Sequence, residues 1–493
     1  MASVPSPGVR RRLVAFVAGA GVATAVLAVL AGKGIATVQR LDHYFWTLGD
    51  RQLLDTAAIL ATGFALSYSI RVVLRGAAHH RRLAAVALIL TGFLFQQSLA
   101  LAEKRGMDGM RDHLLRSGHN EFARTVTTHR VEPLTLIAGY EEFVQAPDQG
   151  FARSKPPGAL LAFWIADEMA QAVMPWIWDP PMSDDSPYVA NLYHWRLANF
   201  ATLFFPLFSY AVLVPLVWLG GKFLGADDAL WPAFLYVLVP ATALVPLHLD
   251  QVLYPFLACA LWATTVAASE AKGRAAVALG AVAGAVAWLS IFVSFSLLPA
   301  LPLAFIFVAA ARVQDGHGQR HSIRAAAAAT AAFIVLSLTA WTLTGYDPIE
   351  RFRRAMDNHM YWKGWEESFR VPATITNTAE FAYWLGVPMV LLFAHGILAA
   401  LRGLRETPNL PSGHARLAMG TFLVLGGTAL LGQTLSEVNR LWLFFVPAIV
   451  IVAAHALRRI AGQRAEAALI AVMALQVGWT IVLKCYEGFP SSP

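Results

Sequence analysis

Potentially reactive side chains lie in the polar stretches that separate the long apolar segments of this sequence. Residues 154–158 read Ser-Lys-Pro-Pro-Gly, which places Lys155 on a stiff turn where its ammonium could hold a phosphate. Glu121 lies about 35 residues upstream and could accept a proton from a hydroxyl, as general-base catalysis requires. In the plainer alternatives, Lys155 is a snorkelling lysine at a proline-capped helix start, and Glu121 is a solvated carboxylate in a loop. Asp108 and Asp112 are close rivals of Glu121.

Two further polar groups occur later in the chain. His248 and Asp250 lie between two long apolar runs, where such side chains are costly unless they face water, so both are functional candidates. Glu437 and Arg440 lie one helical turn apart in a short polar connection. They could pair with each other, or Arg440 could present its planar guanidinium group to a phosphate. These groups predict a polar site that is built from distant parts of the sequence.

The composition indicates a protein whose surroundings are largely lipid. Hydrophobic residues make up 57% of the chain and charged residues only 14%. Segments of ~20 apolar residues can cross ~30 Å of hydrocarbon as helices that satisfy their own backbone hydrogen bonds. The sequence therefore predicts an all-α polytopic membrane protein with about 13 transmembrane helices. The predicted spans lie at about 13–32, 54–74, 84–102, 197–219, 229–248, 251–270, 275–294, 295–312, 325–344, 383–402, 417–435, 440–458 and 466–485.

The basic residues predict the orientation of these spans. Lysine and arginine concentrate in every second connection, and short basic connections face the cytoplasm. The basic stretches are residues 10–12, 71–82, 222, 272–274, 312–324, 402–416 and 458–464. We therefore expect a multi-pass protein of the inner or plasma membrane with a cytoplasmic N-terminus and an extracytoplasmic C-terminus. The net charge of +7 is mainly this topology signal, with attraction to anionic lipids as a by-product, and no basic and aromatic patch indicates nucleic acid.

The polar loops divide the chain into an N-terminal three-helix segment, a large external loop, central spans, an aromatic external loop and C-terminal spans. The corresponding residues are 1–102, 103–196, 197–344, 345–382 and 383–493. In the large loop, residues 160–177 are apolar on one side but carry Asp167, so we expect an amphipathic helix at the membrane surface. In the aromatic loop, Tyr361 and Trp362 could stack on a substrate or anchor the loop at the interface.

Metal and nucleotide chemistry are disfavoured by the motifs. The two cysteines, Cys259 and Cys485, are too few and too far apart for a disulfide framework or a metal site. The 14 histidines lack the spacing of a zinc site, and no glycine-rich phosphate-binding motif occurs. The sequence therefore predicts neither a metal site nor a firm cofactor, although carboxylates could recruit a divalent cation from solution.

Together, these motifs resemble those of the GT-C glycosyltransferases, integral membrane enzymes that include the protein O-mannosyltransferases and the aminoarabinose transferase of lipid A. The resemblance covers most of the chain from about residue 116 to residue 457. It depends on the pair Asn120-Glu121, the Lys-Pro-Pro turn at Lys155, Arg196 at the start of the next span, Asp250 in a proline-rich hairpin and the Glu-x-x-Arg-x-Trp sequence at 437–442. Glu121 replaces the more usual Asp, and the large loop follows the third span rather than the first. An alternative assignment places the catalytic loop after the first span, with Asp42 or Asp50 as the base.

The resemblance implies a sugar donor carried on polyprenyl phosphate and a direct displacement with inversion. Glu121 would deprotonate the acceptor, whose identity the motifs leave open. Lys155, Arg196 and Arg440 would hold the departing phosphate. The residues that would bind sugar or acceptor, or support the cations, are Asn120, His248, Asp250, Tyr361, Trp362 and Glu437.

A transporter or flippase is the main alternative, because it would also have many spans and helices interrupted by proline and glycine. Charges in such proteins lie near the bilayer midplane. Here they gather at one face, and no inverted repeat is found. A ligase that moves a whole lipid-linked glycan is a nearer alternative, since it uses the same leaving group.

Overall fold

All elements that the structure describes are helices. The computed structural model describes residues 15–16, 18–23, 81–101, 106–116, 120–129, 132–145, 150–177, 192–244, 247–315, 320–362, 366–406, 412–434 and 437–486. Within these ranges eight segments are long and apolar enough to cross a membrane. The prediction of an all-α polytopic membrane protein is therefore confirmed, whereas the number of 13 spans stays a prediction. The predicted span 54–74 and most of 13–32 lie outside the described residues.

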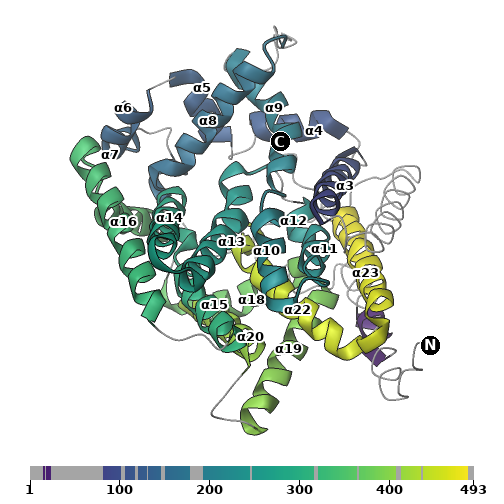
Figure 1. Cartoon of the computed structure of the whole chain (residues 1–493). Coiled ribbons are helices and arrows are strands. Elements are labelled where there is room, and N and C mark those ends of the chain that lie inside the picture. The colour runs from purple at the N-terminus through teal and green to yellow at the C-terminus, as the bar shows by residue number, and fades with distance from the viewer. Residues whose placement is uncertain are drawn as a thin grey trace.

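The long apolar helices form a bundle (Figure 1). Its members are α9 (Leu192–Phe208), α10 (Leu213–Leu224), α13 (Leu249–Glu270), α14 (Gly273–Val293), α15 (Ala300–Asp315), α16 (Arg320–Thr344), α19 (Val387–Glu406), α20 (Gly413–Leu431), α22 (Val446–Ala461) and α23 (Ala465–Tyr486), with the shorter apolar α3 (Arg81–Leu101) beside them. α13 and α22 lie in the main hydrophobic core, since Trp262 of α13 and Val450 of α22 are fully buried.

One predicted span is broken. Residues 229–248, expected to be one helix, form two short helices, α11 (Trp231–Val237) and α12 (Pro240–Leu244). Pro240 has no N–H to continue the ladder, so the helix stops before it. Leu238 and Val239, between the two helices, are fully buried, and irregular backbone at membrane depth is tolerated where protein surrounds it.

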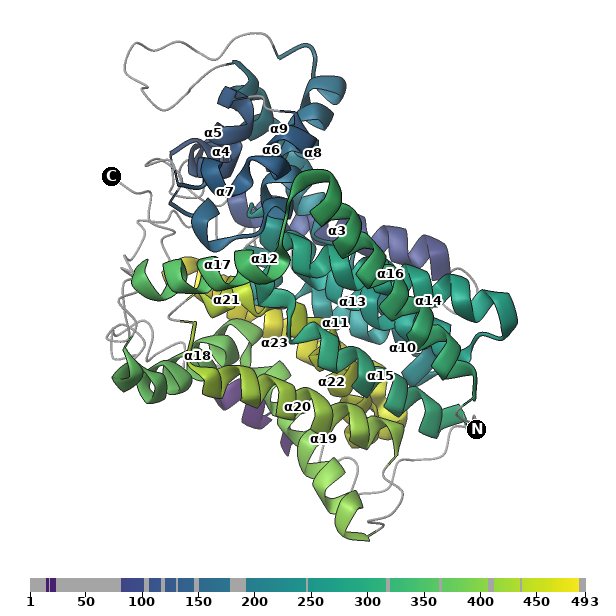
Figure 2. The ribbon, with the colours of Figure 1, turned by 90° about the vertical axis from the view of Figure 1, so that its left-hand side faces the viewer.

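Short helices form a polar layer at one end of the bundle. Figures 1 and 2 place α4 to α8 together in this layer. Its members from the large loop are α4 (Gly106–Arg116), α5 (Asn120–His129), α6 (Pro133–Ala138), α7 (Tyr140–Phe143), η2 (Ala152–Ser154) and α8 (Pro157–Val173). A second hydrophobic core, with Phe122, Phe163 and Phe205 in contact, attaches this layer to α9.

The other short elements connect the remaining spans. They are η3 (Phe295–Leu297), α17 (Pro348–Trp362), η4 (Glu367–Phe369), α18 (Arg370–Leu385), α21 (Val438–Leu441), η5 (Leu443–Phe445) and η6 (Gly462–Arg464). Figure 2 shows α17 and α21 between the polar layer and the bundle. We use the name outer layer for α4 to α8 together with α17 and α21.

Small residues let α14 and α16 pack backbone to backbone. A Cβ atom added at Gly284 would lie 2.0 Å from the carbonyl oxygen of Ala329, and one at Gly280 would lie 2.4 Å from that of Ala325. The Gly-x-x-x-Gly spacing puts both glycines on one face of α14, the arrangement that allows close helix packing in membranes.

We predict that Gly284→Ala destabilises the protein. The new methyl group would meet backbone rather than a flexible side chain, and overpacking of this kind costs about 1–3 kcal/mol. Gly427→Ala on α20 is the matched control, because nothing lies within 4 Å of a Cβ there. Thermal unfolding in detergent should show a lower midpoint for Gly284→Ala alone. Equal midpoints for the two variants would contradict this packing.

Candidate functional site

Glu121 holds the turn that carries Lys155. Its side chain is only 7% exposed. One carboxylate oxygen accepts the backbone N–H of Phe151 at 2.8 Å, and the other accepts that of Ala152 at 2.8 Å. These two donors stabilise the ionised carboxylate and fix the start of η2, which leads directly to Lys155.

A buried tyrosine fixes the other side of the same turn. The Tyr140 hydroxyl lies 3.1 Å from the carbonyl oxygens of both Ala152 and Lys155. Burial raises the pKa of Tyr140 above its usual range, so the hydroxyl stays protonated and donates. After the turn, Pro157 begins α8, and a Cβ at Gly158 would lie 2.2 Å from the carbonyl oxygen of Phe292. The Lys-Pro-Pro-Gly sequence therefore allows the start of α8 to pack closely against the end of α14.

Lys155 reaches the first turns of α13. Its Nζ lies 3.1 Å from the hydroxyl of Tyr254 and 5.7 Å from the centre of that ring. Tyr254 is fully buried and lies less than two turns after the first residue of α13. The lysine is therefore directed toward the bundle.

His248 lies at the same end of α13, where it contacts a histidine that the sequence analysis did not single out. The Nε2 atoms of His113 and His248 are 3.4 Å apart, and the rings meet edge to face with their centres 5.2 Å apart. Burial and, to a lesser extent, the positive charge of Arg440 together lower the pKa of His113 to about 4. His113 is therefore neutral at pH 7. Arg440 acts on His113 through its charge, and α21, which carries Arg440, packs against α13.

Arg440 is buried and paired. It is 5% exposed and contacts the carboxylate of Glu437 at 3.0 Å. The predicted ion pair between these residues is therefore confirmed. Glu437 adopts φ of 68°, the left-handed conformation that a residue with a side chain seldom takes. Such backbone persists where surrounding structure enforces it, which is common at functional sites.

α17 joins the Lys155 turn to the Arg440 segment. Arg351, 2% exposed, contacts the carboxylate of Glu141 at 3.2 Å and also donates to the carbonyl of Arg153. Asn358 donates to the hydroxyl of Ser154 at 2.7 Å. In the next residue of α17, His359, the Nε2 atom lies 2.9 Å from the carbonyl oxygen of Gln433, in the connection that leads to Glu437. The aromatic loop thus contributes through polar side chains, which the sequence analysis did not weigh.

The remaining predicted residues lie in several places. Arg196 of α9 donates to the carbonyl of Ile177 at 3.0 Å, and this contact ties it to the end of the large loop rather than to α13. Tyr361, at the end of α17, is 84% exposed. The helical positions of Asn120 on α5, Asp250 on α13 and Trp362 on α17 are described, but their side chains are not.

Among the other candidates for the base, the structure describes the side chain of Asp108 alone. Asp108 is largely exposed and pairs with Arg111. Asp42 and Asp50, like the side chain of Asp112, lie outside the described residues.

Two buried amides, those of Gln251 and Asn439, lie in the same segments as His248 and Arg440. Gln251 is 3% exposed and Asn439 is 5% exposed. The side-chain oxygen of each is buried without a hydrogen-bond partner within the described part of the chain. Buried acceptors of this kind call for a donor, and hydroxyl groups of a bound ligand could supply it. Gln251 is near His248 and Asn439 is next to Arg440, so proximity in sequence was the signal that could have identified them.

The cluster contains no recognisable metal site in its described part. No group of three or more His, Cys, Asp or Glu side chains among the described residues is placed to hold a metal ion.

Comparison with known proteins finds no family model and no curated protein sequence that matches this chain. The functional argument therefore depends on the residues and contacts of this site.

We predict a pH-dependent contribution of His113 to stability. The unfolded chain binds a proton at this side chain near the ordinary pKa of 6.5, whereas the folded chain resists protonation until about pH 4. Between these values the unfolded state binds more protons, so the free energy of unfolding falls as the pH falls. Above pH 6.5 the contribution is fully present. His113→Gln should lose less thermal stability than wild type between pH 7 and pH 5, and parallel pH dependences would contradict the burial of a neutral histidine.

Proposed function

We propose that this protein is a membrane glycosyltransferase that moves a sugar from a polyprenyl-phosphate donor to an extracytoplasmic acceptor. The observation that supports it best is the approach of Lys155 and of the Arg440 segment, far apart in sequence, to the first turns of α13. Under this proposal the outer layer faces the extracytoplasmic side of an inner or plasma membrane, and the basic connections face the cytoplasm.

The departing phosphate is the group that these cations would stabilise. Negative charge develops on it as the bond to the sugar breaks, and fixed cations in a site that excludes water stabilise that charge strongly. Arg440 is buried and held by Glu437, so its guanidinium group needs little reorganisation. Lys155 is oriented by Tyr254 on a turn fixed by Glu121 and Tyr140. Arg196 is proposed to support this charge from α9 only indirectly, because its described contact is with Ile177.

Glu121 remains the proposed base. Its carboxylate is buried and held in place by the backbone N–H groups of Phe151 and Ala152, next to the turn that carries Lys155. In the proposed step the acceptor hydroxyl gives its proton to Glu121, and its oxygen bonds to the anomeric carbon. The bond from that carbon to the phosphate oxygen breaks on the opposite face, and polyprenyl phosphate leaves as the anion.

The sugar would lie between the cations and the buried amides. The unpartnered oxygens of Gln251 and Asn439 can accept hydrogen bonds from sugar hydroxyls, and His248 lies beside Gln251. We keep Asn120, Asp250, Trp362 and the exposed Tyr361 as proposed contacts of sugar or acceptor. The lipid tail of the donor would lie against the apolar helices, which explains why the site is at the membrane surface.

We predict that Lys155→Ala and Arg440→Ala lower kcat/KM for the lipid donor by about 10²–10³-fold, as loss of one transition-state donor does. Arg440→Lys keeps the charge but loses the planar fork, and should recover part of the activity. Lys272→Ala is the control for removing an exposed positive charge. Lys272 precedes α14, at the end of that helix opposite to the one that the Lys155 turn contacts. The measurement is sugar transfer from polyprenyl-phosphate hexoses and pentoses in proteoliposomes. If both alanine variants depend on the donor concentration as the wild type does, Lys155 and Arg440 do not bind the phosphate.

We also predict that Glu121→Gln lowers transfer by at least about 10²-fold while donor binding is retained. Glutamine keeps the size and one acceptor oxygen, so part of the turn's support remains. Glu132→Gln, an exposed residue that makes no cap at the start of α6, is the control. Full activity of Glu121→Gln would move the base elsewhere, to Asp42, Asp50 or Asp112 for example. Gradient-driven uptake without sugar transfer would instead support a transporter.

A further inference from the structure

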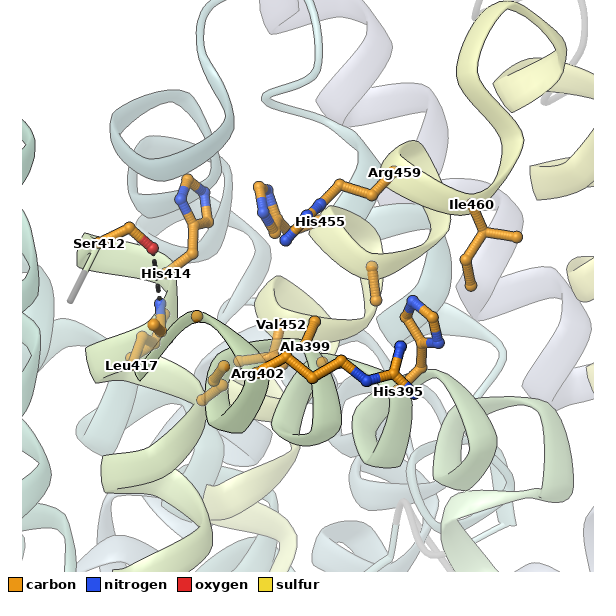
Figure 3. A pocket seen from close by; sticks show the side chains of 16 residues that line it. His395, Ala399, Arg402, Ser412, His414, Leu417, Val452, His455, Arg459 and Ile460 are labelled. Carbon is orange, nitrogen blue, oxygen red and sulfur yellow. Dashed lines mark hydrogen bonds between the residues drawn. The ribbon is translucent and has the colours of Figure 1, made fainter. Parts of the chain in front are cut away.

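A second polar cavity lies at the other end of the bundle. It has a volume of about 460 Å³ and is lined by the last turns of α19 and α22 and the first turns of α20 (Figure 3). α22 begins next to α21 in the outer layer, and its cavity residues lie between Val452 and Ile460. The cavity is therefore separated from Arg440 by the length of α22, and it is independent of the proposed transfer site.

The side chains around this cavity are cationic or can donate hydrogen bonds. Arg402 and His395 lie seven residues apart, on the same face of α19, and Arg459 and His455 lie one turn apart on α22. No carboxylate lines the cavity, and neither arginine forms an ion pair with a residue that the structure describes. Two guanidinium groups facing one hollow repel each other, and a bound anion would relieve that repulsion.

The two histidines between the arginines are closely packed. His414 of α20 stacks on His455 of α22, with ring centres 3.5 Å apart and planes 17° apart. His414 also makes a hydrogen bond with the backbone of Phe223, whereas its Nε2 is buried and has no partner among the described residues. The hydrogen bond to Phe223 and the stack on His455 therefore fix the His414 ring at the wall of the cavity.

The start of α20 adds a favourable field for an anion. Ser412 is its N-cap, and the Ser412 hydroxyl accepts the N–H of Ala415 at 3.2 Å. Ser412, His414 and Ala415 all line the cavity, so the positive end of this 19-residue helix borders it. A metal cation does not suit this lining, because its three histidines are not among any described group placed to hold a metal ion and two arginines already supply positive charge.

We propose that this cavity binds a phosphate group, carried either by the headgroup of an anionic lipid or by a soluble phosphate. The guanidinium groups of Arg402 and Arg459 would bind its oxygens, with the start of α20 and the paired histidines beneath them. Both arginines are exposed at the end of membrane-spanning helices, the depth at which lipid phosphates lie.

Thermal unfolding of the full chain in phosphatidylcholine nanodiscs tests this proposal in two arms. In the first arm, about a fifth of the phosphatidylcholine is replaced by phosphatidylglycerol. In the second, millimolar inorganic phosphate is added and compared with chloride at equal ionic strength. A ligand at free concentration c that binds only the folded chain stabilises it by RT ln(1 + c/Kd), so the unfolding midpoint rises with the ligand concentration. We expect wild type to gain several degrees in at least one arm, and a gain in the lipid arm alone identifies a headgroup.

The variants assign the gain to this cavity. The double variant Arg402→Gln, Arg459→Gln and the single variant His414→Gln should bind at least ten-fold more weakly and lose most of the gain. The control pair is Arg405→Gln, Arg464→Gln, which removes two positive charges from the same end of the bundle but outside the lining. The control should keep the wild-type gain. No gain for wild type in either arm, or an equal loss in the control pair, overturns the proposal.

Discussion

Hydrocarbon cannot solvate an unpaired charge or an open backbone, and this constraint explains where the polar side chains of the protein lie. The long helices satisfy their own backbones, while the buried ion pairs of Arg351 and Arg440 lie in the outer layer at one end of the bundle. In the outer layer, the buried ionic groups have partners: Arg351 has Glu141, Arg440 has Glu437, and Glu121 has two backbone donors. Removing one member of such a pair leaves a buried charge, so these contacts hold the layer in one arrangement.

A series of side-chain contacts links the segments of the outer layer to one another around the first turns of α13. Glu121 and Tyr140 fix the turn of Lys155, Lys155 contacts Tyr254, and His248 contacts His113. α17 connects the Lys155 turn with the segment that leads to Arg440. A site assembled from several segments on rigid supports is preorganised, as electrostatic catalysis requires. α22 begins beside α21 of the outer layer and reaches, near its other end, the cavity lined by Arg402 and Arg459.

Composition was sufficient to predict the fold class, an all-α polytopic membrane protein. Apolar length predicted most described spans, but it predicted one helix at residues 229–248, where Pro240 ends one short helix and begins another. The Glu437–Arg440 pair followed from spacing alone. His113, Tyr254 and Arg351 were missed, because each contacts a residue that is 99 or more positions away in the sequence and no local pattern encodes that contact. Arg196 was grouped with the phosphate ligands by resemblance, whereas its described contact is with the backbone of Ile177.

The most direct measurement is an experimental structure of the protein with polyprenyl phosphate bound in a lipid nanodisc. The account predicts phosphate density at the first turns of α13, within hydrogen-bonding distance of both Lys155 and Arg440, with the lipid tail along the apolar helices. Phosphate bound elsewhere, or Lys155 and Arg440 in separate cavities with packed protein between them, would contradict it.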